Sequence, residues 1–65
     1  SVSDAGVGVL AARAAVLGAG LNVKINASGL KDKEKAEHLV AEANKLIAQA
    51  NEAEAEIMKI VEAKL

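Results

Sequence analysis

The sequence predicts a mainly α-helical fold: an N-terminal apolar helix, one short β-strand at about residues 21–27, and a long C-terminal amphipathic helix at about residues 32–65. Three observations lead to this prediction. Residues 1–20 carry almost no charge, residues 21–28 alternate between apolar and polar side chains, and residues 32–65 repeat apolar side chains at helical spacing. The chain has 65 residues, which favours a single domain, 1–65.

The first helix is expected from about Asp4 to Ala19. Ser3 can serve as its N-cap, and the carboxylate of Asp4 suits the positive end of the helix dipole. Gly18 and Gly20 are typical of a helix end. Apolar residues occur on every side of this segment, so we expect a helix that is buried all round or lies in lipid.

Two alternatives remain open for this segment. Ala5–Leu10 could form a second strand, since Val7 and Val9 alternate with glycines. Residues 5–21 could also cross a membrane, but a span of 17 residues is short and Arg13 near its middle is costly in lipid. A membrane partner is therefore the less favoured interpretation.

The predicted strand rests on strict alternation. Its apolar side holds Leu21, Val23, Ile25 and Ala27, and its polar side holds Asn22, Lys24, Asn26 and Ser28. A single strand leaves its backbone N–H and C=O groups unpaired, which is costly where they are buried. We therefore expect this strand to pair with the same strand of a second copy.

The second helix is the clearest element. Asp32 is a good N-cap, and apolar residues then recur on one face: Ala36, Leu39, Val40, Ala43, Leu46, Ile47, Ala50, Ala53, Ile57, Ile60 and Val61. Unbroken, this helix would be about 50 Å long. The alternative is a break near Asn51, which forms a possible capping box with Glu54.

Composition indicates that the core needs a partner. The chain has no aromatic residue and no cysteine, and a protein this small buries a limited core by itself. The expected partner is the chain itself, as a homo-oligomer. The predicted interface residues are Leu21, Val23, Ile25, Leu39, Val40, Leu46, Ile47, Ile57, Ile60 and Val61.

Two charges stand out because they interrupt apolar surfaces. Arg13 needs a carboxylate, and Asp4 is nine residues, or about 13 Å, away along a helix. A carboxylate from another copy and exposure to solvent are the two possibilities for Arg13. Glu54 interrupts the apolar stripe of the second helix and could face a lysine of a partner.

No catalytic chemistry is visible. A nucleophile–base pair cannot be built, because the chain lacks Cys and Tyr and its one histidine, His38, falls on the polar helix face. We expect no catalytic, cofactor-binding or metal-binding residue, no cofactor, no evident small-molecule ligand, and no enzyme activity. A formal net charge of −1 gives no case for nucleic acid.

One stretch resembles a known family. Residues 20–47, GLNVKINASGLKDKEKAEHLVAEANKLI, look like the strand–helix segment of the OsmC/organic hydroperoxide resistance family, which forms intertwined dimers and reduces peroxides with a cysteine pair. This chain has Ile47 where the second cysteine of that family would follow its helix. The resemblance therefore implies a dimer-forming element without peroxidase activity.

The whole chain also resembles a de novo designed helical homo-oligomer. Its second half uses Ala, Glu, Lys and Leu in a regular binary pattern. The expected function is a self-associating structural or scaffold module. The alternatives are a fibre- or membrane-embedded assembly subunit using residues 5–21 and a cysteine-less OsmC-like dimerisation fragment. No secretory signal is visible, so we expect a soluble protein, cytoplasmic if expressed recombinantly, with its natural compartment undefined.

Overall fold

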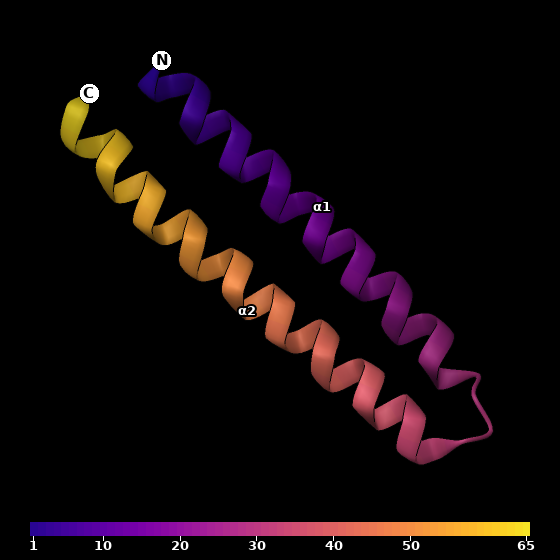
Figure 1. Ribbon diagram of the computed structural model, residues 1–65. Helices are drawn as coiled ribbons and strands as arrows, with labels where there is room; N and C mark the ends of the chain where they lie inside the picture. The colour runs from indigo at the N-terminus through magenta and orange to yellow at the C-terminus, as the bar shows by residue number, and fades with distance from the viewer.

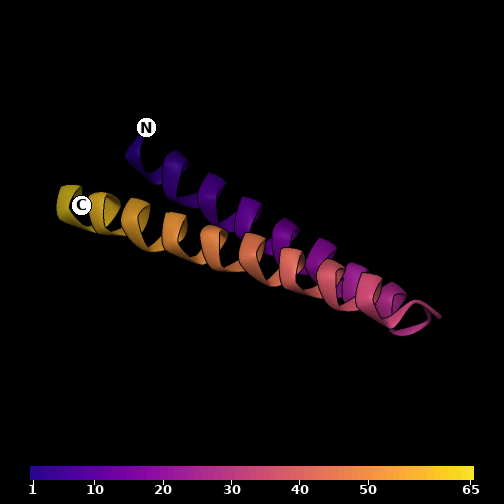
Figure 2. The ribbon, with the colours of Figure 1, turned by 60° about the horizontal axis from the view of Figure 1, so that its bottom comes forward.

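The computed structural model describes all 65 residues as two antiparallel α-helices joined by a short turn (Figure 1). Helix α1 spans Val2–Ser28 and helix α2 spans Lys33–Lys64. The molecule measures 50 × 14 × 10 Å, and the two helices lie side by side in both ribbon views (Figures 1 and 2). Both termini therefore lie at one end of the rod and the turn at the other.

Helix α1 begins earlier than the sequence predicts. Ser1, not Ser3, is the N-cap: its hydroxyl accepts a hydrogen bond from the backbone N–H of Asp4 at 3.3 Å. The carboxylate of Asp4 in turn lies 3.3 Å from the N-terminal ammonium group. This reciprocal capping box starts the helix at Val2. The predicted helix over residues 4–19 is confirmed, and the alternative strand at residues 5–10 is wrong.

The predicted strand at residues 21–27 is also wrong, because α1 continues through it to Ser28. Gly20, Val23 and Ala27 recur at helical spacing; Gly20 and Ala27 are buried and Val23 is half-buried. Residues 21–27 thus fit the two-residue period of a strand and the 3.6-residue period of a helix. Only the helical conformation buries Gly20 and Ala27 against α2. A helix also pairs its own backbone groups, so the problem of a strand without a partner does not arise.

Gly20 does not end the helix but allows close packing. A Cβ atom at this position would lie 2.8 Å from Cδ1 of Ile47 in α2. The helix ends instead at Gly29, whose N–H donates to the carbonyl of Asn26 at 3.2 Å. Ser28 supports this end by donating its hydroxyl to the carbonyl of Ile25 at 2.6 Å.

Helix α2 matches its prediction closely. Asp32 is the N-cap, and its carboxylate accepts a hydrogen bond from the N–H of Lys35 at 3.1 Å. The helix then runs to Lys64 without interruption. The alternative break near Asn51 is therefore wrong, since α2 contains neither glycine nor proline to stop it.

The interior between the helices is thin. Only five residues are buried, and no large side chain is fully buried; the five are Gly6, Gly20, Ala27, Ala43 and Val61. The small residues bring the two backbones together, as at Gly6, where a Cβ atom would lie 3.5 Å from the methyl groups of Val61. The structure gives no support to completion of this core by copies of the chain, and that part of the prediction stays untested.

Most of the apolar surface of α1 faces outward. Val7 is 68% exposed and Leu21 and Ile25 are each 60% exposed. By length and composition alone α1 could cross a membrane, with a mean hydropathy of 1.5 over its most apolar window, of which 11% is buried. A core helix of a soluble protein meets the same criteria of length and composition.

Candidate functional site

Arg13 finds its carboxylate inside the same chain. Its Nε lies 2.7 Å from Oε2 of Glu54 in α2, and its Nη1 donates a hydrogen bond to Oδ1 of Asn51 at 3.4 Å. The Nε–H is not aimed squarely at the carboxylate, so the contact is an ion pair rather than a well-aligned hydrogen bond. Arg13 therefore pairs with a carboxylate of its own chain, and neither predicted alternative, a carboxylate of a second copy or exposure to solvent, describes it.

Asn51 and Glu54, which have the spacing of a capping box, both contact Arg13 instead. Neither residue caps a helix, because α2 continues through them. Both supply oxygen atoms to the guanidinium group, and the side chains of Arg13 and Glu54 are 35% and 21% exposed. Charges that are partly removed from water need such a partner, so the three residues form one unit.

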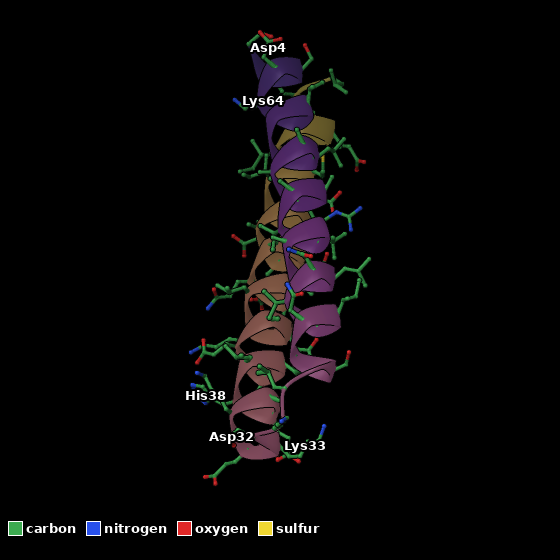
Figure 3. The ribbon with its side chains drawn as sticks, turned by 90° about the vertical axis from the view of Figure 1, so that its right-hand side faces the viewer. Asp4, Asp32, Lys33, His38 and Lys64 are labelled. Atoms are coloured by element: carbon green, nitrogen blue, oxygen red, sulfur yellow. The ribbon has the colours of Figure 1, made fainter.

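A hollow of about 560 Å³ lies where the end of α1 meets the start of α2. Two lysines line it, Lys24 from α1 and Lys33 from α2, together with the amide of Asn44 and the carboxylate of Glu37. Its remaining lining residues are Ala27, Ser28, Ala36, Val40 and Ala41. Figure 3 shows Lys33 at this end of the rod, with Asp4 and Lys64 at the opposite end.

The hollow combines cationic donors with an apolar wall. Lys24 is half-buried, and the ammonium group of Lys33 donates to the carbonyl of Leu30 at 3.1 Å, which holds it near the turn. Glu37 offsets one of the two positive charges. The arrangement suits a ligand with an anionic group on an apolar body, because ammonium groups bind anions as point charges. It provides binding groups but no nucleophile–base pair.

Sequence reasoning missed this site. The strand prediction placed Lys24 and Ser28 on the polar side of a strand that pairs with a second copy. Helical spacing would have placed them one turn apart on one side of α1, close to the start of α2. A helical interpretation of residues 21–28 was therefore the signal that could have found the hollow.

A second hollow, of about 420 Å³, shares no residue with the first and is almost wholly apolar. Its lining is Val16, Ala19, Gly20, Val23, Ala43, Leu46, Gln49 and Ala50. No charged residue reaches it, so it is suited to packing rather than to chemistry.

The predicted interface residues fall into two groups. Val61 is buried and packs at Gly6, Ile47 packs at Gly20, and four others are half-buried along the hairpin: Val23, Leu39, Val40 and Ile57. The remaining four are more than half exposed: Leu21, Ile25, Leu46 and Ile60. Contact between copies through these residues stays a prediction.

His38 is exposed and lies on the opposite side of α2 from Lys33 (Figure 3). It lines a shallow polar hollow with Asp32, Glu34 and Lys35. No three His, Cys, Asp or Glu side chains of the chain come close enough together to hold a metal ion.

Comparison with known proteins gives two matches. The sequence model of the formiminotransferase-cyclodeaminase family matches residues 1–45, which include all of α1 and the start of α2. A methenyltetrahydrofolate cyclohydrolase of Methylorubrum extorquens (strain AM1) is 42% identical over 64 residues, or 98% of this chain. The chain spans 31% of the length of that relative. No solved structure matches the chain.

These matches correct several expectations. The resemblances to a designed homo-oligomer and to the OsmC family are wrong, because the chain matches the formiminotransferase-cyclodeaminase family and a relative that is named a methenyltetrahydrofolate cyclohydrolase. The predicted structural scaffold without enzyme activity is overturned by the same finding. The family match covers well over half of the residues, and the relative matches along both helices. The chain therefore belongs to the formiminotransferase-cyclodeaminase family.

Proposed function

We propose that this chain works as part of a folate-dependent one-carbon enzyme of the cyclohydrolase type. The observation that carries the proposal is the 42% identity to a methenyltetrahydrofolate cyclohydrolase over 64 residues. Because the match covers 98% of the chain, it includes both helices and the turn between them. A soluble, cytoplasmic setting is part of this proposal.

The hollow at the turn is the site that this function would use. A folate carries carboxylates at its glutamate end and a flat ring system at the other. Each of the two ammonium groups, of Lys24 and of Lys33, can hold a carboxylate, while Ala36 and Val40 supply apolar surface in the same hollow. The hollow is an open depression, so it can contact one end of a ligand but does not enclose it. The role assigned to these two lysines is therefore binding and orientation of the anionic end.

A chimera tests this function. In the Methylorubrum relative, the stretch that matches this chain is replaced by the 65 residues, and hydrolysis of methenyltetrahydrofolate is followed by absorbance. We expect an active chimera in which Lys24→Ala and Lys33→Ala each raise KM about tenfold, the effect of losing one charge-assisted contact, with little change in kcat.

Lys64→Ala is the matched control, because this lysine is exposed at the far end of the rod (Figure 3). It should leave KM unchanged. A folded chimera without hydrolytic activity would reject the proposed function. An active chimera whose KM is indifferent to both lysine substitutions would reject the hollow as the folate site.

A further inference from the structure

One charged group in the hollow at the turn has no role in the proposed function. Glu37 is the only carboxylate among the residues that line this hollow, and it is exposed. Lys33 lies four residues before it on α2, which is a usual spacing of an ion pair on a helix. The ammonium group of Lys33 donates instead to the carbonyl of Leu30 at 3.1 Å. Both ion pairs of the chain lie elsewhere, at Asp4 and at Glu54, so the carboxylate of Glu37 has no cationic partner.

Glu37 shares one side of α2 with other groups of the hollow. Four of the lining residues follow one another along α2 at spacings of three or four: Lys33, Glu37, Val40 and Asn44. Such a spacing brings side chains to one side of a helix. Glu34, only three residues before Glu37, lines a different hollow beside His38. The two glutamates near the turn therefore face different surroundings, and only Glu37 borders the lysines and the apolar surface together.

The register of the hairpin places Glu37 between the two lysines of the hollow. Ile47 packs at Gly20 and the helices are antiparallel, so Lys24 lies level with a point four residues before Ile47. That point is about 9 Å from Glu37 along the axis of α2. Lys33 lies about 6 Å from Glu37 in the opposite direction. A single carboxylate thus has a cationic group on either side of it.

The charges of methenyltetrahydrofolate have a matching arrangement. Its methenyl carbon joins two nitrogen atoms as a cationic amidinium, and its glutamate tail carries carboxylates. The aminobenzoyl unit and the amide bond between these two groups span about 10 Å by standard bond lengths. A tail carboxylate held by Lys24 or by Lys33 therefore brings the methenyl cation to the level of Glu37. The open hollow would contact the substrate from its tail to the methenyl group and leave the pterin ring outside.

We propose that Glu37 is the general base of the hydrolysis, a role that rests on the proposed function. Its carboxylate takes a proton from the attacking water as the water oxygen bonds to the methenyl carbon. The electron pair of the C=N bond moves to nitrogen and cancels the positive charge. The carboxylic acid then returns the proton to the ring nitrogen as the bond between this nitrogen and the carbon breaks. The hydroxyl group loses its proton to solvent and becomes the formyl carbonyl, so one proton is released and Glu37 is again a carboxylate.

The first test uses the chimera. Glu37→Gln keeps the shape of the side chain but removes the base, so kcat should fall by about a hundredfold or more, with a much smaller change in KM. Glu34→Gln makes the same change in the neighbouring hollow and should leave kcat unchanged. The acid limb of the pH profile of kcat should be absent from Glu37→Gln, because that limb reports protonation of the base. Added formate should restore part of the activity of Glu37→Ala, since the open hollow admits a small carboxylate.

The 65-residue chain gives a second test that does not need the chimera. In mildly acidic buffer, where the methenyl compound is stable, calorimetric titration compares methenyltetrahydrofolate with folic acid, which has the same tail but no amidinium charge. The chain should bind the methenyl compound roughly fivefold more tightly, the effect of one exposed ion pair. Glu37→Gln should remove this preference, and Glu34→Gln should keep it.

The outcomes separate this role of Glu37 from the proposed function. An active chimera whose kcat is indifferent to Glu37→Gln overturns the role and leaves the proposed function in place. An acid limb that persists in Glu37→Gln, with no recovery of Glu37→Ala by formate, assigns Glu37 a structural role and overturns it too. A folded chimera without hydrolytic activity rejects the proposed function and this role with it. If the chimera does not fold, equal binding of the two ligands by the chain, or a preference that survives Glu37→Gln, overturns the role.

Discussion

Helices α1 and α2 are of similar length but differ in the surface they turn away from each other. Of 27 residues in α1 three are charged, whereas 12 of 32 are charged in α2. Where they meet, both helices use small residues, such as Gly20 and Ala43. The contact surfaces are thus alike and the outer surfaces are not. The share of apolar residues on the outer surface of a helix indicates how many neighbouring elements it packs against. The size of the side chains in the contact surface indicates only how closely one neighbour approaches.

The largest effect should follow from placing a charge in the contact between the helices. Val61 is 5% exposed and faces Gly6, so Val61→Asp buries a carboxylate without a partner and should cost several kcal/mol, on the order of 3. Ala55→Asp places the same group on the exposed side of α2 and should cost well under about 1 kcal/mol. Urea denaturation of the chimera measures both. Equal losses of unfolding free energy for Val61→Asp and Ala55→Asp would show that Val61 is not buried between the two helices.

The next largest loss of stability is expected at Gly20, where the two helices approach each other closely. Gly20→Leu should destabilise the chimera by about 1–3 kcal/mol, because even its Cβ atom would meet Cδ1 of Ile47 at 2.8 Å. Adding Ile47→Ala removes the opposing atoms and should recover part of the loss, so the two changes should not be additive. Additive losses in urea denaturation would contradict the proximity of these two positions.

A smaller effect is expected at the ion pair. Arg13→Leu or Glu54→Leu should each cost about 1–2 kcal/mol, because each leaves a partly buried charge without its partner. The double substitution Arg13→Leu with Glu54→Leu should cost less than the sum, since it leaves no charge behind. A double-mutant cycle measured by urea denaturation gives the coupling free energy. A coupling near zero would mean that the two side chains do not meet in solution.

The smallest change in stability is expected at Gly8, on the outer surface of α1. A Cβ atom at Gly8 meets nothing within 4 Å in the hairpin, so Gly8→Ala should raise the helix content of the isolated chain, with a gain of up to about 1 kcal/mol. In the chimera a neighbour is expected on that side of α1, and the gain should shrink or reverse. Circular dichroism of the chain and urea denaturation of the chimera give the two values. The same full gain in both would indicate that this side of α1 stays open.

The sequence alone predicted α2 almost completely, because its charges and apolar residues separate cleanly and Asp32 marks its start. It predicted only the first part of α1. Residues 21–27 carry the period of a strand and the period of a helix at once, and burial of Gly20 and Ala27 against α2 decides between them. That decision depends on a contact with Ile47, which a local pattern does not contain.

The candidate site was harder to predict than the fold. Arg13 and Glu54 are 41 residues apart, so their pairing depends on the hairpin being formed. Lys24 and Lys33 line the same hollow only because α1 extends to Ser28 and the chain then reverses. The proposed folate role has no local signature in the sequence, since no nucleophile, metal cluster or phosphate loop marks it, and the proposal rests on the relative.

The thin contact between α1 and α2 has a consequence for alignment along the rod. Apart from Ile47 against Gly20 and Val61 against Gly6, the buried contact is made by small side chains, so few contacts oppose sliding of one helix along the other. A slide by one helical turn, about 5.4 Å, would pull the guanidinium group of Arg13 away from both Asn51 and Glu54. Arg13, Asn51 and Glu54 therefore help to set the register of the hairpin, and this register decides where Lys24, about three turns from Arg13 along α1, lies against α2.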